Sequence, residues 1–224
     1  VKIQDGCNQF CSYCIIPYVR GRIRSRDIAS IIEEVERLAL TGVKEIVLTG
    51  IHISSYGKDK ENEVGLADVI DAISKIESIK RIRLGSLEPS IITDEFIDRI
   101  VDNEKVCPHF HLSLQSGCNT VLKRMNRKYT CEEYFEKCEM LRKAFDRPAL
   151  TTDVIVGFPG ETEEEFRETV DYLTKLNLYE MHIFKFSPRQ GTVAAGMKDQ
   201  VAPEIKNQRS DVLLALSERN KQAY

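Results

Sequence analysis

The chain has 224 residues, of which 42% are hydrophobic and 30% charged, and its formal net charge is −3. This size suits a single α/β barrel, whereas the absence of any apolar run near ~20 residues excludes a membrane span, and no secretory signal segment opens the chain. The seven cysteines are odd in number and irregularly spaced, which argues against a disulfide framework and for the reducing cytoplasm. The small net charge requires any nucleic-acid site to be a local basic patch.

Short β-type runs alternate with amphipathic helical patterns along the chain. The predicted strands are residues 1–4, 45–49, 81–85, 110–114, 150–156 and 181–186. The predicted helices are residues 28–40, 66–76, 94–101, 132–145, 163–176 and a closing helix over 203–222. Strands that alternate with helices form βαβ units around a parallel sheet. We therefore predict an α/β fold, a partial (β/α)6 barrel of parallel strands with its active site at the carboxyl ends of the strands.

Two helix starts carry the capping-box pattern, in which a threonine precedes a glutamate by three residues. Thr130 precedes Glu133, and Thr162 precedes Glu165. Each pair is expected to satisfy two backbone groups that lack partners within the helix.

Three cysteines near the start of the chain follow a C-x3-C-x2-C spacing, with a tyrosine directly before the last: Cys7, Cys11, Tyr13 and Cys14. Thiolate sulfur is a soft ligand that selects zinc, Cu(I) or iron–sulfur clusters. A structural zinc site takes a fourth ligand close by, but the next histidine is His52 and the next cysteine Cys107. Three thiolates on a four-iron cluster leave one iron open for chemistry. The alternative is a zinc knuckle or three unrelated thiols.

Other side chains that follow predicted strands are candidates for the same site. Pro89 restricts Glu88 to an extended backbone, so Glu88 is expected to bind a cationic or amine-bearing group, or to pair with Arg83. Gly157 allows a backbone to approach a planar ligand closely, and Phe158 adds an aromatic ring. The alternative for this last segment is a tight turn between strand and helix.

Two basic stretches are candidates for phosphate binding. The first has arginine at every second position, and the second has cations at helical spacing: Arg20, Arg22, Arg24 and Arg26, then Lys123, Arg124, Arg127 and Lys128. In an extended segment, the first four guanidinium groups lie on one side, where each fork can bind phosphate oxygens. The alternative is a solvated rim paired with acidic residues.

The cysteine spacing with its tyrosine resembles the signature of radical S-adenosylmethionine (SAM) enzymes. The resemblance implies that the three cysteines hold a [4Fe–4S] cluster, that SAM binds the open iron, and that SAM is cleaved to a 5′-deoxyadenosyl radical. With the candidates named from their positions after the strands, the residues expected to contact SAM are Tyr13, Thr49, Gly50, Ser86, Glu88, Gln115, Arg124, Asp153, Gly157 and Phe158. The glutamate that often follows glycine after the second strand is missing here, so the alternative for Thr49 and Gly50 is a plain turn.

Further motifs are similar to the central domain of the tRNA methylthiotransferases. They are Cys14-Ile15-Ile16-Pro17-Tyr18-Val19-Arg20-Gly21, Leu48-Thr49-Gly50-Ile51-His52, Leu114-Gln115-Ser116-Gly117 and Phe186-Ser187-Pro188-Arg189. Two segments, Ile46-Val47-Leu48-Thr49-Gly50-Ile51-His52 and Arg24-Ser25-Arg26, resemble the branch that acts on threonylcarbamoyladenosine at position 37 of tRNA. Sister branches act on isopentenyladenosine in tRNA or on ribosomal protein S12.

This resemblance implies that residues 1–224 are a radical SAM catalytic domain. The family flanks this domain with an N-terminal domain, which binds a second [4Fe–4S] cluster, and a C-terminal RNA-binding TRAM domain. The start at Val1, without a methionine, indicates an excised domain. The implied partners are a tRNA anticodon loop, through the basic residues Arg20, Arg22, Arg24 and Arg26, and an electron donor such as flavodoxin or ferredoxin. We expect a monomer with no membrane partner.

Two functions compete with this interpretation. One is a non-catalytic, zinc-stabilised RNA-binding module with zinc on the cysteines and the arginines on phosphate. The other is a radical SAM enzyme that acts on a different substrate.

Overall fold

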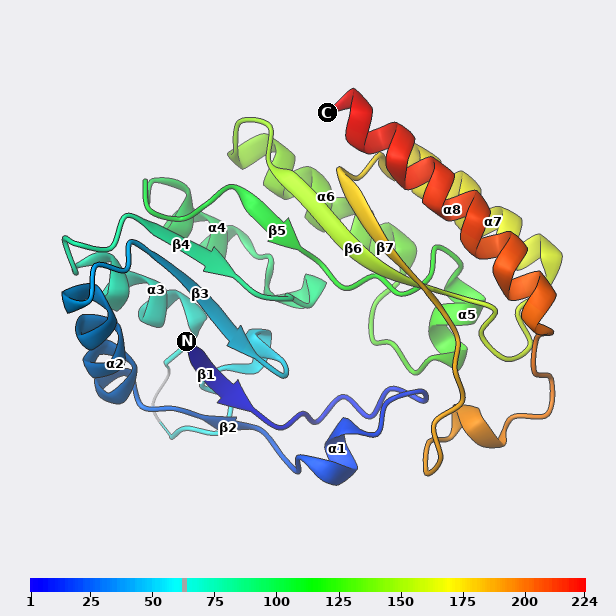
Figure 1. The fold of residues 1–224 in the computed structure, drawn as a ribbon, viewed down its shortest axis with the longest axis horizontal. Helices are drawn as coiled ribbons and strands as arrows, with labels where there is room; N and C mark the ends of the chain where they lie inside the picture. Colours follow the sequence, from blue (N-terminus) through cyan, green and yellow to red (C-terminus); the bar gives the residue numbers. More distant parts are fainter. Residues whose placement is uncertain (62–63) are drawn as a thin grey trace. The chain divides into compact units, whose positions relative to one another are not determined.

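The structure, a computed structural model, describes residues 1–61 and 64–224, which form two compact units. The first unit contains residues 1–8, 16–111 and 139–148, and the second contains residues 9–15, 112–138 and 149–224. Figure 1 shows most of the first unit in blue to green and most of the second in green to red.

The first unit is built on a four-stranded sheet in the order β2-β1-β3-β4. The bounds are β1 Lys2–Asp5, β2 Arg24–Ser25, β3 Glu45–Gly50 and β4 Arg81–Leu84. Strand β3 is parallel to both β1 and β4. The short strand β2 runs antiparallel to β1, which is a departure from the all-parallel sheet that the sequence predicts. Strand β5, His109–His111, follows β4, and the Cys107 amide just before β5 donates to the Ile82 carbonyl at 3.0 Å.

Helices follow the strands of this unit in the βαβ manner. They are α1 Ile16–Val19, α2 Ile28–Leu40, α3 Leu66–Ser74 and α4 Asp94–Val101, with the 3-10 turns η1 Ile53–Ser55 and η2 Pro89–Ile91. Helix α2 packs against α3, and α3 packs against α4. Ile46 and Ile82 lie opposite each other on β3 and β4 and are both buried, because strands of a parallel sheet are covered by helices.

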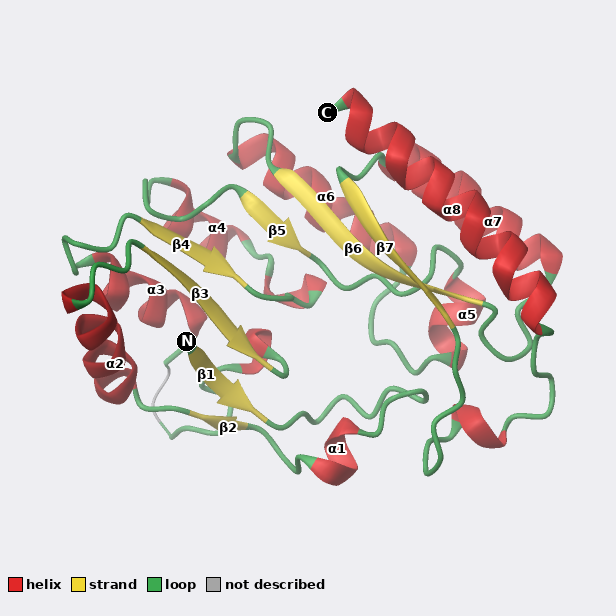
Figure 2. Cartoon of the chain, viewed as in Figure 1, coloured by secondary structure: helices red, strands yellow, loops and turns green. Residues whose placement is uncertain are grey.

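The second unit contains a pair of longer parallel strands with two long helices. The bounds are β6 Ala149–Val156, β7 Glu180–Lys185, α5 Asn119–Arg124, α7 Glu163–Leu176 and α8 Pro203–Ala223, together with η3 Ala194–Gly196 and the first part of α6, Cys131–Ala144. Helix α8 packs against β7 and α7, and Figure 2 shows the two helices side by side. The hydroxyl of Ser217 on α8 accepts a bond from the Met181 amide at 2.9 Å, which fixes α8 along β7.

Most predicted elements are confirmed, and helices α2, α4 and α7 have the predicted bounds. The predicted strand over 110–114 is shorter, because a side chain interrupts its ladder. The Leu112 amide donates to the Thr151 carbonyl at 2.9 Å, but the Leu114 amide donates to the Thr152 hydroxyl at 3.0 Å. Regular pairing is therefore interrupted after residue 112, and an isolated parallel bridge joins Gln115 to Val154 beyond the interruption.

Both predicted capping boxes are present. The Glu133 amide donates to the Thr130 hydroxyl at 3.2 Å, and the Thr130 amide donates to the Glu133 carboxylate at 2.7 Å. Thr162 and Glu165 make the same exchange at 3.2 and 3.0 Å.

Over residues 1–61 and 64–224, no helix combines the length and apolarity that a membrane crossing demands.

Candidate functional site

The backbone before the first cysteine requires glycine at position 6. Gly6 has a φ of +71°, and a Cβ atom there would lie 1.8 Å from the carbonyl oxygen of Arg22. The next residue, Cys7, donates its amide to the Gly21 carbonyl at 3.1 Å. The backbone after β1 therefore packs directly against residues 21–22, which follow α1, and this contact fixes the backbone of Cys7.

Gln4 joins the carboxyl ends of β1 and β3. Its side chain is buried, and its Nε2 donates to the carbonyl of Gly6 at 2.7 Å. Its Oε1 accepts the His52 amide at 2.8 Å. Sequence analysis missed Gln4, because a glutamine at the end of a strand carries no signal of burial.

The segment with the other two cysteines belongs to the second unit, which holds it by backbone bonds. The Cys14 amide donates to the Cys11 carbonyl at 2.9 Å, so the two residues share one tight turn. Between them, the Ser12 amide donates to the Met125 carbonyl at 3.0 Å, and the Ser12 carbonyl accepts the Ala194 amide at 2.8 Å. Two distant segments of the unit therefore hold this turn in place.

Cys11 and Tyr13 lie among polar and aromatic side chains of the second unit. Arg127 Nη1 donates to Cys11 Sγ at 3.1 Å. The Tyr13 ring meets the Phe158 ring edge-on, with 6.4 Å between their centroids. Burial raises the pKa of Tyr13 well above its ordinary value, although the charge of Arg127 opposes this shift. The phenol therefore stays neutral and acts as packing and as a hydrogen-bond group beside Cys11.

The three cysteines of the motif have the properties that iron–sulfur ligands need. Cys7 and Cys11 are buried and Cys14 is half-buried. All seven cysteines lie among the described residues, and none of these forms a disulfide. Three reduced thiols within eight residues, one with a cationic hydrogen-bond donor, are a donor set that fits a [4Fe–4S] cluster.

Glu88 lies in a polar cluster at the ends of β3 and β4. Its carboxylate is 6% exposed, and Oε2 is 3.3 Å from Nε2 of His52. The hydroxyl of Ser90 donates to the same oxygen at 3.1 Å, and Nδ1 of His52 lies 2.6 Å from the hydroxyl of Ser55. The Ser90 hydroxyl therefore holds this carboxylate, and the His52 ring, held in turn by Ser55, lies beside it.

The alternative partner that the sequence suggested for Glu88, Arg83, binds elsewhere. Arg83 Nε donates to Glu45 at 2.9 Å, and Arg81 donates to the same carboxylate at 2.5 Å. These two bonds, of which the bond from Arg81 has the larger effect, hold the pKa of Glu45 below its ordinary value. The structure also places Thr49, Gly50 and Ser86 at exposed positions in the first unit.

The turn after β6 is held by a buried carboxylate. Gly157 has a φ of +68°, and its amide donates to Glu161 Oε2 at 2.6 Å. Arg209 Nη1 donates to the same oxygen at 2.7 Å. The ring of Phe158 is fully buried, where it packs on Tyr13 and on Phe186. Gly157 is buried as well, and a Cβ atom there would lie 2.3 Å from the side chain of Lys206, so the turn is closely packed on both sides.

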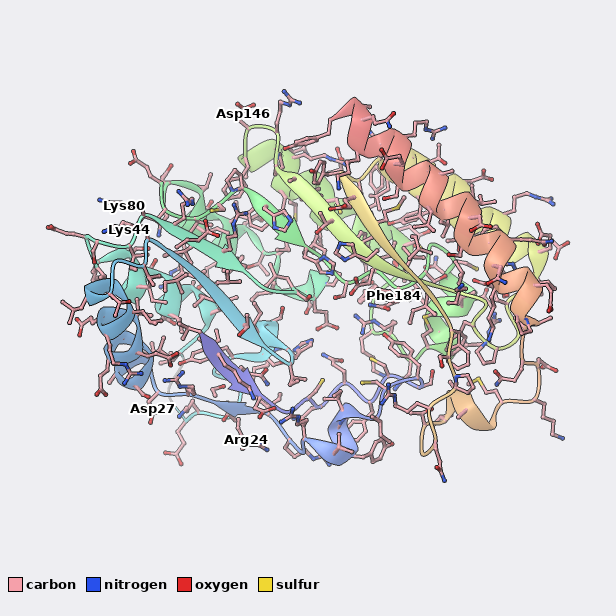
Figure 3. All side chains as sticks on the ribbon, in the orientation of Figure 1. Arg24, Asp27, Lys44, Lys80, Asp146 and Phe184 are labelled. Carbon is pink, nitrogen blue, oxygen red and sulfur yellow. The ribbon has the colours of Figure 1, made fainter. Side chains whose placement is uncertain are left out.

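Gln115 and Asp153 lie next to each other in the second unit. Gln115 has a φ of +79°, and its amide donates to the Asp153 carbonyl at 2.9 Å. Asp153 Oδ1 is 3.3 Å from Nδ1 of His182, which is its register partner on β7. Two residues further along β7, Phe184 is 53% exposed, and Figure 3 shows it near the carboxyl end of that strand.

Arg124 already has an anionic partner. Its Nη1 and Nη2 donate to the two carboxylate oxygens of Glu165 at 2.9 and 2.6 Å, and Nη2 also donates to the Gly160 carbonyl at 3.2 Å. The bond from Arg124 holds the pKa of Glu165 below its ordinary value. In this arrangement Arg124 supports the turn that ends at Gly160.

The four alternate arginines of the first unit, here called the arginine row, differ in exposure, and two of them, Arg20 and Arg24, lie 4.0 and 3.6 Å from the Asp5 carboxylate. Arg20, Arg22 and Arg24 are exposed, and Figure 3 shows Arg24 at strand β2. Arg26 instead donates to Glu34 at 2.6 Å and to the carbonyl of Lys2 at 2.8 Å. The strand covers only Arg24–Ser25, so the extended stretch is shorter than predicted.

An exposed aromatic residue lies beside this row. Tyr18 on α1 is 62% exposed, two positions before Arg20. Exposed aromatic rings near cations are typical of surfaces that stack single-stranded bases. Sequence analysis did not single out Tyr18, because only the structure shows that its ring is outside the core.

Comparisons with known proteins identify the family and the fold. Residues 1–173 match the radical SAM superfamily, whose cofactors are a [4Fe–4S] cluster and SAM. Among solved structures, the methyltransferase TsrM from Kitasatospora setae is 20% identical to this chain, with a TM-score of 0.72. The superposed region covers 87% of this chain and 38% of the TsrM chain. The oxidase HemN from Escherichia coli is 17% identical, with a TM-score of 0.70, and the superposed region covers 98% of this chain and 51% of the HemN chain. The predicted partial α/β barrel of the radical SAM type is thereby confirmed.

Two curated relatives match nearly the whole chain. The threonylcarbamoyladenosine tRNA methylthiotransferase MtaB of Bacillus subtilis is 48% identical over 226 residues, which cover 100% of this chain and 50% of that protein. The tRNA-2-methylthio-N(6)-dimethylallyladenosine synthase of Alkaliphilus oremlandii is 46% identical over 214 residues, which cover 96% of this chain and 45% of that protein. The chain thus spans about half the length of these relatives. It belongs to the radical SAM superfamily and, within it, is similar over its whole length to tRNA methylthiotransferases.

Proposed function

We propose that this chain is the radical-generating domain of a tRNA methylthiotransferase that modifies C2 of N6-threonylcarbamoyladenosine 37. The observation that carries the proposal is the 48% identity to the Bacillus subtilis enzyme over the full chain, a chain that contains the cysteine motif of Cys7, Cys11 and Cys14. Dimethylallyladenosine synthases at 46–47% identity favour the second candidate, the same reaction on isopentenyladenosine.

In this proposal Cys7, Cys11 and Cys14 hold the cluster, which with bound SAM supplies a 5′-deoxyadenosyl radical. Glu88, whose carboxylate accepts the Ser90 hydroxyl, binds a positively charged part of SAM, because a buried carboxylate favours a cation. The backbone at Gly157, held by Glu161, lies along the adenine.

Other candidate residues complete the SAM site. Thr49, Gly50 and Ser86 offer exposed polar groups beside Glu88, while Gln115 and Asp153 serve the ribose or methionyl part. Tyr13 and Phe158 pack beneath the ligands and exclude water, and Arg124 supports the turn through Glu165.

The remaining proposals concern the whole protein. Residues 1–224 form its catalytic domain, and the part outside this chain supplies a second [4Fe–4S] cluster and an RNA-binding TRAM domain. The tRNA anticodon loop binds along Arg20, Arg22, Arg24 and Arg26. The electron donor is of the flavodoxin or ferredoxin class, the protein is a monomer, and it acts in the cytoplasm, where tRNA is found.

Two experiments test the function. Anaerobic reconstitution with iron and sulfide should give a protein that cleaves SAM when reduced, and Cys11→Ala should abolish both iron uptake and cleavage. The matched control is Cys107→Ala, a half-buried cysteine outside the motif, which should retain both. Stoichiometric zinc without labile sulfide would contradict the proposal and favour the RNA-binding module.

The substrate is identified by mass spectrometry of tRNA nucleosides from a strain that lacks the gene. Loss of the methylthio group from threonylcarbamoyladenosine is the expected result. Its loss from isopentenyladenosine would select the second candidate, and an unchanged tRNA would exclude both.

A further inference from the structure

Arg127 contacts a cysteine ligand directly. Its Nη1 donates to Cys11 Sγ at 3.1 Å, within the second unit. Its Nε donates to the hydroxyl of Tyr129 at 2.8 Å, and its guanidinium carbon lies 4.8 Å from the centre of that ring. The Tyr129 hydroxyl in turn donates to the Leu114 carbonyl at 2.8 Å. Because the ring and its hydroxyl are fixed, the guanidinium has one orientation, with one edge toward the sulfur.

The partners of Arg127 differ in kind from those of two other arginines of the second unit. Arg124 binds the carboxylate of Glu165, and Arg209 binds that of Glu161. The oxygens that Arg127 contacts, the Tyr129 hydroxyl and the Ser113 carbonyl, are neutral. The sulfur of Cys11 is therefore the contact at which a negative charge would balance this guanidinium, and it becomes a thiolate when it binds iron.

The residues next to Arg127 hold the same cysteine segment. Asn126 Nδ2 donates to the Phe10 carbonyl at 2.8 Å, and the Met125 carbonyl accepts the Ser12 amide at 3.0 Å. The position of the guanidinium relative to Cys11 is thus set by one side-chain bond and one backbone bond, which hold the residues on either side of Cys11.

We propose that Arg127 is a positioning residue that orients Cys11 Sγ toward the cluster and raises the reduction potential of that cluster. This inference rests on the proposed function, because it requires the three cysteines to bind a [4Fe–4S] cluster. It adds a residue outside the cysteine motif to the groups that control electron entry.

The sign of the effect follows from charge. One electron passes from an external donor of the flavodoxin class to the cluster, so the reduced form carries one more negative charge. A fixed cation that donates to a ligand sulfur stabilises the more negative form. Removing it therefore makes reduction harder and moves the midpoint potential to more negative values.

The test is an anaerobic redox titration followed by the electron paramagnetic resonance signal of the reduced cluster. The protein is reconstituted with iron and sulfide and reduced with dithionite in the presence of mediators. We compare Arg127→Met, Arg127→Lys and the control Lys128→Met, which removes an equal charge from the next, exposed position. For Arg127→Met we expect at least a tenfold lower ratio of reduced to oxidised cluster at the wild-type midpoint, which is about 59 mV for one electron. Arg127→Lys should shift less, and Lys128→Met should titrate as wild type.

Each outcome separates this inference from the function on which it rests. A wild-type protein that takes up no cluster overturns both. A wild-type protein that binds the cluster and cleaves SAM, with Arg127→Met at an unchanged potential, overturns this inference alone. An equal shift of the midpoint potential in Lys128→Met also overturns it, because the loss of any nearby positive charge would then explain the shift. If Arg127→Met takes up no cluster, the potentials of Arg127→Lys and Arg127→Gln are measured instead. Midpoint potentials equal to that of the wild type in both variants would contradict the proposal.

Discussion

Arg209 and Glu161 form an ion pair in which both side chains are almost entirely buried, with 2.7 Å between Nη1 and Oε2 and exposures of 6% and 1%. The same carboxylate oxygen accepts the Gly157 amide. A residue of the C-terminal helix therefore sets the conformation of the turn at which we place the adenine of SAM. This role explains why a charged pair lies where an apolar one would pack as well.

Arg209→Met should destabilise the chain strongly, because it leaves Glu161 buried without its cation. Removing one partner of a buried pair costs about 3–5 kcal/mol. The double variant Arg209→Met/Glu161→Gln should recover much of this loss, because it buries no charge and keeps an acceptor for Gly157. Urea unfolding of the three proteins gives the free energies. A single variant as stable as the wild type would show that the pair carries no such penalty.

The destabilisation by Arg209→Met should depend on pH. Burial raises the pKa of Glu161, while the Gly157 amide and Arg209 oppose that shift. Without Arg209 the folded-state pKa rises further above its unfolded value, so the folded form loses stability as pH increases through this window. The stability difference from wild type should therefore be small near about pH 5 and larger near about pH 8. Unfolding curves across this range test it, and the double variant should show no such trend.

Gly6→Ala should prevent residues 7–14, which carry the three cysteines of the motif, from adopting their native backbone. A left-handed residue with a Cβ costs about 1–2 kcal/mol, and at position 6 that Cβ also meets the Arg22 carbonyl. The matched control is Gly42→Ala, which has a φ of +92° but nothing within 4 Å of its Cβ. We expect Gly6→Ala to lower both the melting temperature and the iron content, and Gly42→Ala to lower only the former, slightly. Similar iron contents in both variants would refute the role of the Gly6 contact.

The sequence predicts regular elements well where a local pattern is sufficient. The helix over 163–176 has a threonine–glutamate capping box at its start and an apolar stripe, and its bounds are found as predicted. The short helices Ile16–Val19 and Asn119–Arg124 were missed, because one or two turns are too short for a periodic signal.

The contacts of charged side chains could not be predicted in this way. Arg124 and Arg127 belong to a basic stretch that the sequence assigns to phosphate, yet one binds Glu165 and the other Cys11. Their partners are 41 and 116 residues away. Neither composition nor periodicity carries information about a pairing at that separation.

Glu88→Gln should weaken SAM binding without loss of the cluster. The variant keeps the size of the side chain but replaces one acceptor oxygen by an NH2 donor and removes the charge that we propose faces a cationic part of SAM. We expect the dissociation constant to rise about tenfold, which corresponds to about 1.4 kcal/mol. Equilibrium binding of SAM to the reconstituted protein measures it. Glu45→Gln, a carboxylate paired with two surface arginines, should bind SAM as the wild type does. Equal affinity in Glu88→Gln would remove Glu88 from the site.

The arginine row should contribute unequally to tRNA binding. Arg20 and Arg24 have side-chain exposures of 54% and 58% and lie 4.0 and 3.6 Å from Asp5, whereas Arg26 is bound to Glu34 at 2.6 Å. Exposed guanidinium groups are available to phosphate, and removal of one such group should lower the salt slope of the affinity by about 1. Arg20→Ala and Arg24→Ala in the full-length protein should therefore weaken binding and reduce the slope. Arg26→Ala should mainly lower stability, because its guanidinium is only 33% exposed and is held by both Glu34 and the Lys2 carbonyl. Titrations of tRNA at several salt concentrations distinguish these cases, and an identical slope in all three variants would mean that the RNA binds elsewhere.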